Sequence, residues 1–400
     1  MRILGLTHLY PNPFNPHLAP FNRNLFRALR DRNAVQVIAP IPWTVEVRAR
    51  RNGTAPLPAD RRVELDGLTV DHPRFYFPPK VLQRTYGPLF AKSAWQVFRR
   101  AAAEFRPDLV YAPWAYPDGW AAVRLARRIG RPVVVQVLGS DVLVLAKHRQ
   151  RRRLTFEGLR AADAVVAVSR DLARRVTDNG VEPDRVRVIY EGVDPDRFHP
   201  GPRPDARWRV GLTPDDGPVI LFVGNLVKVK GIDVLIDACG LLARAGVPFQ
   251  CRLIGKGPLA GSLQARIDRL GLGDRVNLLG AKPQTELPDW YRASDLFVLP
   301  SHSEGVPNVL LEASACGTPC VASRVGGIPE ITGRGDIHLV PTADPTALAI
   351  AIHAVLSNRR RRRSSAPVRT RADAVDELED FLAGVLHRFA ASRPLVTTGS

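Results

Sequence analysis

Short apolar runs, each long enough for one strand, alternate with amphipathic segments along most of the 400-residue chain. Strands that are apolar on both faces must be covered on both faces, and the segments between them are long enough to be the covering helices. The pattern therefore predicts an α/β protein with parallel, doubly wound sheets. The predicted strands are 3–7, 35–40, 109–112, 133–138, 164–169 and 186–189 in the first half, and 219–224, 250–255, 276–280, 296–300 and 319–323 in the second.

A segment rich in proline and glycine, 194–204, separates the two sets of strands. This composition is typical of a linker, and a chain of this length can form two domains with separate cores. We expect a first Rossmann-like domain over 1–198, a second over 199–371, and a C-terminal helix within 372–400 that packs back on the first domain and ends in a flexible tail. The carboxyl ends of the two sheets, where such sheets bind ligands, are expected to face each other across a cleft. The arginine run 359–363 is interpreted as a solvated loop.

The composition indicates what kind of protein this is and which partners it could have. Hydrophobic residues make up 45% and charged residues 24% of the chain, as in globular proteins. No apolar run reaches the roughly 20 residues that span a bilayer, and the first residues resemble a core strand, so we expect a cytoplasmic protein. The four cysteines, which lack metal-type spacing, are expected to be reduced and buried. The net charge of +18 favours a polyanionic partner, or else reflects a generally arginine-rich surface. No nucleic-acid-binding motif is present, so nucleic acid is not an expected partner.

The segment 303–312, with the sequence SEGVPNVLLE, carries the most chemical information. Pro307 suits the first turn of a helix, because its missing N–H would be unpaired there anyway. The free N–H groups of 305–308 would then form an anion site at the helix start. Glu304 and Glu312 flank this site, Glu312 at roughly 8 Å from the anion. A nucleotide sugar, with a charged centre and hydroxyl-rich ends, fits such a site; taken alone, the segment fits an ordinary α/β turn equally well.

Three other strand ends in the second half offer turns at the same predicted sheet edge. Gly224 ends one strand, and Lys230 in the following turn can reach a phosphate. Gly255 begins a second glycine-rich turn, and at the third strand end a flat base could lie against backbone and apolar atoms around Leu279. Each of these could equally be an ordinary βα turn, and Lys230 could be a surface lysine.

In the first half, the strand 133–138 ends in Leu138 and Gly139, and Asp141 follows. Asp141 could accept hydrogen bonds from a sugar or acceptor hydroxyl, or it could cap the next helix. Ser169 is predicted to be a helix N-cap. Glu191 follows another strand end beside the linker, where it could contact the ligand.

Together these segments resemble the retaining glycosyltransferases of glycosyltransferase family 4, which have the GT-B fold of two Rossmann-like domains. The resemblance covers most of residues 1–357. Its most specific part is the pair Glu304 and Glu312, eight positions apart, with Gly305, Pro307 and Asn308 between them. The other matching stretches are 107–110, 132–142, 169–172, 188–194, 224–231, 255–259, 293–296 and 319–330.

The resemblance implies a transferase that moves a hexose from a UDP- or GDP-sugar to a hydroxyl of a lipid-linked or polysaccharide acceptor. Glu304 would hold hydroxyls of the donor sugar and Glu312 the ribose, while Lys230 and the backbone of 305–309 would stabilise the diphosphate leaving group. That phosphate would help to deprotonate the acceptor in a front-face attack. Neither a cofactor nor a metal is expected, because no Asp-x-Asp cluster stands at a strand end in the predicted cleft.

The predicted site residues fall into three groups. The donor residues are Gly224, Asn225, Lys230, Gly255, Leu279, Glu304, Gly305, Val306, Pro307, Asn308, Val309 and Glu312. The acceptor residues are His17, Leu138, Gly139 and Asp141. The catalytic residues are Glu304, Lys230 and Asp141.

Three positions depart from the family pattern. The family often has Arg where Asn225 stands and His or Arg where Leu138 stands, and the loop 10–20 lacks a double glycine near the acceptor pocket. Losing one cationic contact at such a site costs about 3 kcal/mol, unless Lys228 or Arg324 replaces it. The alternative function is therefore a nucleotide-sugar-binding or partner protein with a weakened catalytic centre. A polyanion-binding protein is a third interpretation, which only the charge supports.

The segment 90–105 is apolar on one face and basic around it, and a second basic cluster spans 147–153. Such a helix can lie on an anionic membrane or can pack on the sheet, and packing is the favoured interpretation. The hypothesis that remains open is a first domain that docks peripherally at the inner face of the cell membrane.

Overall fold

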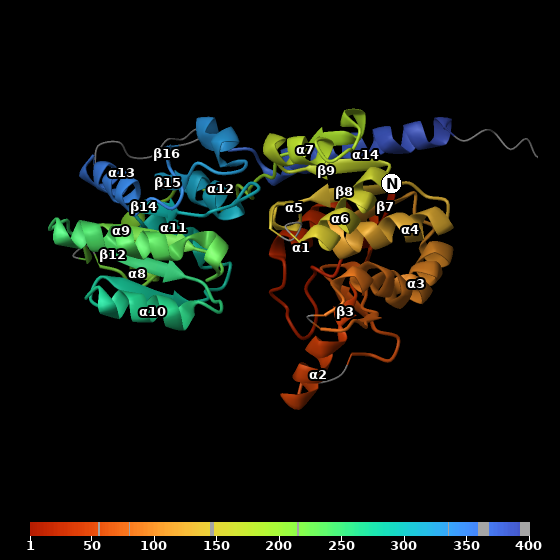
Figure 1. The fold of residues 1–400 in the computed structure, drawn as a ribbon, viewed down its shortest axis with the longest axis horizontal. Coiled ribbons are helices and arrows are strands. Elements are labelled where there is room, and N and C mark those ends of the chain that lie inside the picture. Colours follow the sequence, from red (N-terminus) through yellow and green to blue (C-terminus); the bar gives the residue numbers. More distant parts are fainter. Residues whose placement is uncertain are drawn as a thin grey trace, which may run out of the picture. The chain divides into compact units, whose positions relative to one another are not determined.

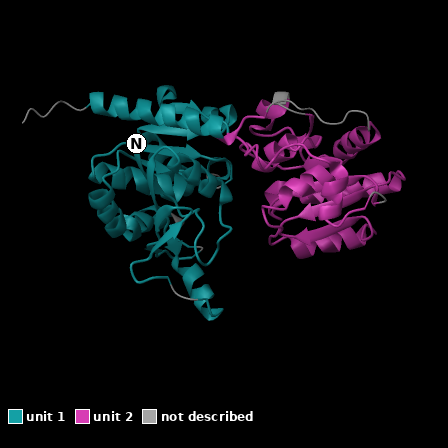
Figure 2. Ribbon diagram, turned by 180° about the vertical axis from the view of Figure 1, so that it is seen from behind, with its two compact units in different colours: residues 1–190, 372–400 teal, residues 191–371 magenta. Residues whose placement is uncertain are grey.

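The computed structural model describes residues 1–54, 57–79, 81–144, 148–213, 216–334, 336–358 and 368–392. It divides the chain into two compact units, of which unit 1 comprises Met1–Tyr190 with Ala372–Ser400 and unit 2 comprises Glu191–Arg371 (Figure 2). The predicted loop at 359–363 and the predicted tail beyond residue 392 lie outside the described residues.

The boundary lies at Tyr190/Glu191, whereas we expected it at 198/199. The reason is local pairing within unit 2. The N–H of Val193 donates to the carbonyl of Arg369 at 3.0 Å, and the N–H of Arg371 donates to the carbonyl of Val193 at 2.7 Å. These bonds tie Val193, directly before the predicted linker, to the end of the second unit.

Unit 1 contains an eight-stranded sheet in the order β10-β9-β8-β7-β1-β2-β5-β4. Figure 1 shows β7, β8 and β9 of this sheet among the helices of the unit. The predicted strands of this half are all present, as β1 (Arg2–Leu6), β2 (Ala34–Ile38), β7 (Leu109–Ala112), β8 (Val133–Val137), β9 (Ala164–Ala167) and β10 (Val186–Val188), and their pairings are parallel. Two strands that pair antiparallel at one edge, β4 (Arg62–Leu65) and β5 (Leu68–Asp71), were not predicted. The short pair β3 (Ile41–Pro42) and β6 (Arg74–Phe75) was not predicted either.

Two core clusters take alternate side chains of the same strands. Leu4, Val110 and Ala112 lie in one cluster, and Ile3 and Leu109 lie in the other. This is why the central strands are apolar without alternation. The helices of unit 1 are α1 (Pro20–Arg30), α2 (Trp43–Arg51), α3 (Tyr86–Phe105), α4 (Trp120–Arg128), α5 (Ser140–Leu143), α6 (Arg149–Ala161), α7 (Arg170–Thr177) and α14 (Arg371–Ala391), with η1 (Gln83–Thr85), η2 (Ala115–Gly119) and η4 (Pro183–Arg185) as short turns.

Helix α3 packs its apolar face into the core. Phe90, Ala94, Phe98 and Ala101 are completely buried there, so the packing interpretation of 90–105 is confirmed. Helix α14, expected to pack back on the first domain, buries Val375, Leu378, Leu382 and Val385 in the second cluster of unit 1. Among the described residues, no helix has both the length and the apolar character that crossing a bilayer requires.

Unit 2 contains a fully parallel sheet in the order β13-β12-β11-β14-β15-β16. Numbered within the unit, this is 3-2-1-4-5-6, the order of the doubly wound nucleotide-binding fold. Its strands are β11 (Val219–Val223), β12 (Gln250–Ile254), β13 (Val276–Gly280), β14 (Leu296–Leu299), β15 (Cys320–Ser323) and β16 (Ile337–Val340), of which only β16 was not predicted. Its helices are α8 (Arg203–Arg209), η6 (Lys228–Lys230), α9 (Ile232–Arg244), α10 (Ala260–Arg269), α11 (Leu287–Ala293), α12 (Asn308–Ala315), η7 (Ile328–Arg334) and α13 (Pro345–Ser357). The predicted α/β class, with two Rossmann-like units of the GT-B type, is confirmed.

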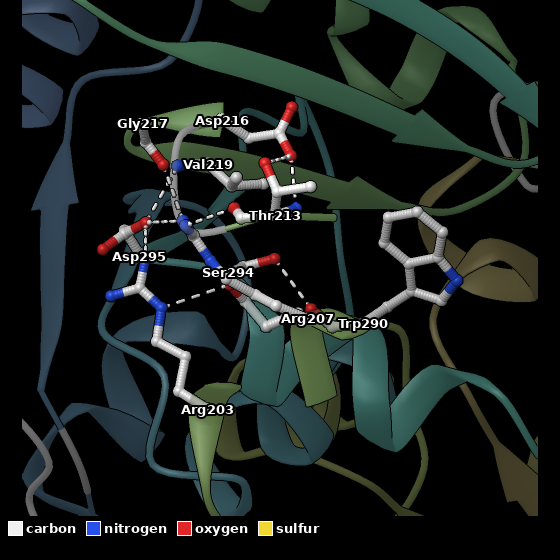
Figure 3. Close-up of polar contacts among 10 residues, drawn as sticks. Arg203, Arg207, Thr213, Asp216, Gly217, Val219, Trp290, Ser294 and Asp295 are labelled. Carbon is white, nitrogen blue, oxygen red and sulfur yellow. Dashed lines mark hydrogen bonds and ion pairs between the residues drawn. The ribbon is translucent and has the colours of Figure 1, made fainter. Parts of the chain in front are cut away.

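A buried ion cluster fixes α8 to the start of β11 (Figure 3). The carboxylate of Asp295 accepts the N–H of Val219 at 2.9 Å and the guanidinium of Arg207 at 3.1 Å, and it also pairs with Arg203. Arg207 is only 6% exposed and donates further to backbone carbonyls, including that of Gly217 at 2.6 Å. Asp295 thus pairs with two guanidinium groups of α8 and joins this helix to β11. Removing this carboxylate would leave both pairs broken.

The smaller structural predictions agree with the structure. All four cysteines are free and buried. Ser169 caps α7, and its hydroxyl accepts the N–H of Leu172 at 3.1 Å.

Candidate active site

The strand order of unit 2 reverses between β11 and β14, and ligands of such sheets bind beyond the carboxyl ends at that point. The turns that follow these two strands are in direct backbone contact. The N–H of His302 donates to the carbonyl of Val229 at 2.8 Å. A Cβ on Gly231 would lie 2.1 Å from the carbonyl oxygen of Pro300, so only glycine allows this approach. The fold thus brings together two turns that lie about 70 positions apart in the sequence.

Lys230 and Glu304 meet at this junction. The Nζ of Lys230 lies 2.6 Å from Oε1 of Glu304, and the hydroxyl of Ser301 donates to the same oxygen at 2.6 Å. Neither side chain is sealed from solvent, with 21% of Lys230 and 11% of Glu304 exposed. The ammonium has three N–H donors, and within the described segments only Glu304 takes one of them, so two remain for a ligand. Among the described residues no donor to Oε2 of Glu304 is found, so Oε2 can accept a hydroxyl.

A glycine pair in the turn after β15 supports the backbone of Glu304. Gly326 has φ +53°, and a Cβ there would lie 1.8 Å from the carbonyl oxygen of Glu304. The N–H of Gly327 donates to the carbonyl of Gly305 at 2.9 Å. The position of Glu304 is therefore set from both sides, by Lys230 and Ser301 through its side chain and by the glycine pair through its backbone.

Helix α12 begins directly after this turn. It starts at Asn308 after Pro307, and no side chain in the described part of the chain caps it. Its first N–H groups and the positive end of its dipole can therefore serve an anion. The side chain of Asn308 hydrogen-bonds Glu191, a carboxyl whose pKa is raised by burial and lowered in part by that bond. Lys230 and the start of α12 both contribute positive potential at this edge.

Glu312 has a different environment from Glu304. It is 9% exposed, and it accepts the hydroxyl of Tyr291 at 2.9 Å. Burial raises its pKa above the ordinary value, against the opposing effects of the Tyr291 bond and the charges of Arg197 and Arg371. Burial and the nearby Glu312 carboxyl likewise raise the pKa of Tyr291. A carboxyl that is fixed by one phenol can still exchange hydrogen bonds with a pair of vicinal hydroxyls.

The other predicted donor residues line neighbouring strand ends. A Cβ on Gly255, where φ is +153°, would lie 1.8 Å from the carbonyl oxygen of Gly224, so these two turns also touch. The N–H of Gly255 donates to the carbonyl of Gly280 at 2.8 Å, which joins the turn next to Leu279. Asn225 is exposed, as are Lys228 and Arg324, the two residues considered as cationic replacements.

The role predicted for Asp141 in unit 1 is wrong. Its carboxylate is 2% exposed and accepts the backbone N–H groups of Ala115 (3.2 Å), Leu138 (3.2 Å), Gly139 (2.9 Å) and Val142 (3.1 Å). A carboxylate enclosed by four backbone donors cannot also hold a substrate hydroxyl. Asp141 instead stabilises the turn between β8 and α5. It is not the cap of the alternative interpretation either, because it lies inside α5, whose N-cap is Gly139.

The remaining predicted acceptor residues are more open. Leu138 is half-buried against the core of unit 1, and Gly139 has φ +131°, a conformation suited to glycine. His17 is exposed in the loop before α1. Sequence reasoning missed one polar pair in this unit, His8 and Asp118, whose ring nitrogen and carboxylate lie 2.7 Å apart. His8 follows the first strand closely, but no spacing pattern links it to a residue 110 positions away.

No group of three or more His, Cys, Asp or Glu side chains is gathered as a metal site in the part of the chain that the structure describes. Metal independence stays a prediction.

Comparisons with known proteins identify the family. A family model described as "Glycosyltransferase Family 4" matches residues 18–197, and one described as "Glycosyl transferases group 1" matches 205–368. The protein named D-inositol 3-phosphate glycosyltransferase 1 from Catenulispora acidiphila is 38% identical over 286 residues, which are 65% of this chain and 68% of that protein. The chain belongs to glycosyltransferase family 4. It spans about half the length of two similarly named relatives, from Acidothermus cellulolyticus and C. acidiphila.

Solved structures agree at the level of the fold. Sucrose-phosphate synthase from Thermosynechococcus elongatus has a TM-score of 0.76 at 23% identity, with 98% of this chain and 99% of that chain covered. HepE from Anabaena, solved in complex with UDP, has a TM-score of 0.69 at 20% identity over the same shares. At these identities the likeness concerns architecture alone.

Proposed function

We propose that this family 4 member is a retaining, metal-independent hexosyltransferase that uses a UDP-sugar donor. The observation that carries the proposal is the contact between Lys230 and Glu304 at the strand-order reversal of unit 2, directly before the uncapped start of α12. The structures of Anabaena HepE in complex with UDP and with UDP-glucose support uridine over guanosine.

Each residue then has a task that follows from its surroundings. The two free donors of Lys230 and the first N–H groups of α12 bind the diphosphate and stabilise the charge that develops as the bond to the sugar breaks. Oε2 of Glu304 accepts a hydroxyl of the hexose, and Glu312 together with Tyr291 holds the ribose. Fixed positive charge at the leaving group provides what a divalent metal would otherwise supply, which supports metal independence.

The acceptor is a hydroxyl compound, and two classes compete. The lipid-linked or polysaccharide acceptor loses one support, because the apolar face of α3 is buried in the core. The first residue of the basic cluster 147–153 lies outside the described residues. A phosphorylated polyol is favoured by the name of the similar C. acidiphila protein, and it suits the net charge of +18. If the acceptor is lipid-linked, unit 1 would dock on an anionic membrane to reach it.

The test is nucleotide release and transfer. Purified protein is incubated with UDP-glucose, UDP-N-acetylglucosamine or GDP-mannose, with D-inositol 3-phosphate or a polyprenyl-linked glycan as acceptor, in the presence and absence of EDTA. Lys230→Met and Glu304→Gln are expected to lower kcat at least a hundredfold, the usual effect of losing one stabilising contact of this kind. The matched control is Arg266→Gln, which breaks the ion pair with Asp237 elsewhere in unit 2. The anomeric configuration of the product, read by NMR, decides retention.

A second candidate rests on Asn225. If the exposed amide leaves the diphosphate short of one cation, the protein binds nucleotide sugars without turning them over. Tight UDP-sugar binding without product from any acceptor supports that alternative, whereas the absence of both binding and transfer contradicts both candidates.

A further inference from the structure

Unit 1 has its own strand-order reversal, and a polar pair lies beside it. The chain leaves β1 toward β2 and β5 on one side, while β7, β8, β9 and β10 continue on the other. The reversal therefore falls between β1 and β7, which pair in parallel from Ile3↔Leu109 onward. His8 follows the carboxyl end of β1, and Asp118 lies in the η2 turn after β7. This is the place in unit 1 that corresponds to Lys230 and Glu304 in unit 2.

The pair is built around a fully buried carboxylate. Asp118 is 0% exposed and receives three donors, namely the hydroxyl of Thr7 at 2.9 Å, the backbone N–H of His8 at 3.0 Å and the ring Nδ1 of His8 at 2.7 Å. The side chain of His8 itself is 23% exposed. The carboxylate is thus enclosed, while the imidazole that it holds reaches the surface.

The contact with Asp118 determines which ring nitrogen of His8 carries the proton. A carboxylate can only accept, so it keeps a proton on Nδ1 of His8 and leaves the lone pair of the neutral ring on Nε2. Among the described residues no partner of Nε2 is found. A hydrogen-bond acceptor with a fixed direction, at the ligand-binding edge of a doubly wound sheet, suits a ligand that carries hydroxyl groups.

We infer that His8, oriented by Asp118, is a hydroxyl-binding residue for the acceptor substrate, a polyol or sugar. The inference rests on the proposed function, because the donor features all lie in unit 2 and glycosyl transfer needs a second substrate with a hydroxyl. Nε2 of His8 accepts the hydrogen bond of an acceptor hydroxyl and so fixes its orientation. Asp118 acts through His8 and is a positioning residue.

His8→Asn separates this role from a structural one. The asparagine amide can still donate to Asp118 in place of Nδ1, but it has no counterpart of Nε2. With UDP-glucose as donor and D-inositol 3-phosphate as acceptor probe, His8→Asn is expected to raise the acceptor KM about tenfold, the effect of one lost hydrogen bond. The dissociation constant of UDP is expected to stay within twofold. Arg185→Gln, which breaks the exposed ion pair with Glu182 elsewhere in unit 1, is expected to leave the acceptor KM unchanged.

A second measurement does not depend on turnover. In protein labelled with 15N-histidine, the His8 signals, assigned by their loss in His8→Asn, are expected to show the proton on Nδ1 and to shift at Nε2 when myo-inositol is added. A proton on Nε2, or an unchanged acceptor KM in His8→Asn, overturns the inference. If the wild-type protein neither binds UDP nor transfers sugar, the proposed function fails on its own, and the tautomer and the myo-inositol titration still decide the role of His8.

Discussion

Replacing Gly326 by alanine should displace Glu304 without touching its side chain. Two effects add at this position. An alanine at φ +53° costs about 1 kcal/mol in the left-handed region. The new Cβ would also lie 1.8 Å from the carbonyl oxygen of Glu304, where real Cβ contacts stay above 3.0 Å, so two backbone segments must separate. Overpacking of this severity costs about 1–3 kcal/mol more.

Gly246 provides the matched control. It has φ +69° at the end of α9, and a Cβ there meets nothing within 4 Å. Gly246→Ala thus carries the conformational cost alone, and part of that is offset by the lower entropy of the unfolded chain. The difference between the two variants isolates the clash, which we expect to be about 2 kcal/mol.

Hydrogen–deuterium exchange measures the mobility of the Glu304 turn, and calorimetry measures the binding of UDP-glucose. In Gly326→Ala, amides of 300–312 should exchange faster and UDP-glucose should bind at least tenfold more weakly, because the Glu304 carboxylate moves with its backbone. In Gly246→Ala only amides around the end of α9 should respond. If both variants bind UDP-glucose like the wild type and the 300–312 segment is unchanged, the glycine pair does not set the position of Glu304 and the reasoning is wrong.

Three further predictions concern charge. Burial raises the pKa of Glu312 above the ordinary 4.5, so the folded state holds this proton more tightly than the unfolded chain does. The free energy of unfolding should therefore fall as the pH rises from 4.5 through the raised pKa. In a series of urea denaturations at different pH, Glu312→Gln should flatten this part of the profile. Asp295→Asn should lower the free energy of unfolding by about 3 kcal/mol because Arg207 is left buried without its carboxylate, whereas Asp237→Asn, at the more exposed pair with Arg266, should have little effect. Asn225→Arg should tighten UDP binding about tenfold by calorimetry; unchanged affinity would mean that this position does not face the diphosphate.

The sequence predicted those elements whose structure is determined by their own residues and not by distant contacts. An apolar run specifies a buried strand by itself, and a glycine or proline specifies the turn beside it. This is why β11, β14 and the Glu304 turn were placed correctly. The strands that were missed have polar or mixed sequences, as in β4 and β5, and gain their stability from a partner strand. Asp141 was misjudged for the same reason, since its four donors include Ala115, from a turn remote in sequence.

The two glutamates of the 304–312 segment illustrate what sequence spacing leaves undetermined. Both are carboxylates eight positions apart, yet Glu304 is held by a lysine and a serine, whereas Glu312 is held by a tyrosine and has a raised pKa. Charging a buried carboxyl weakens the fold, so Glu312 lowers stability at neutral pH where a glutamine would pack without that penalty. Glu312 lies in α12, the helix that begins the candidate phosphate site, so the proposed function assigns its carboxyl a role in binding the donor. Glu312→Gln should therefore gain stability at neutral pH and lose affinity for UDP, whereas Glu304→Gln should lose activity and gain no stability.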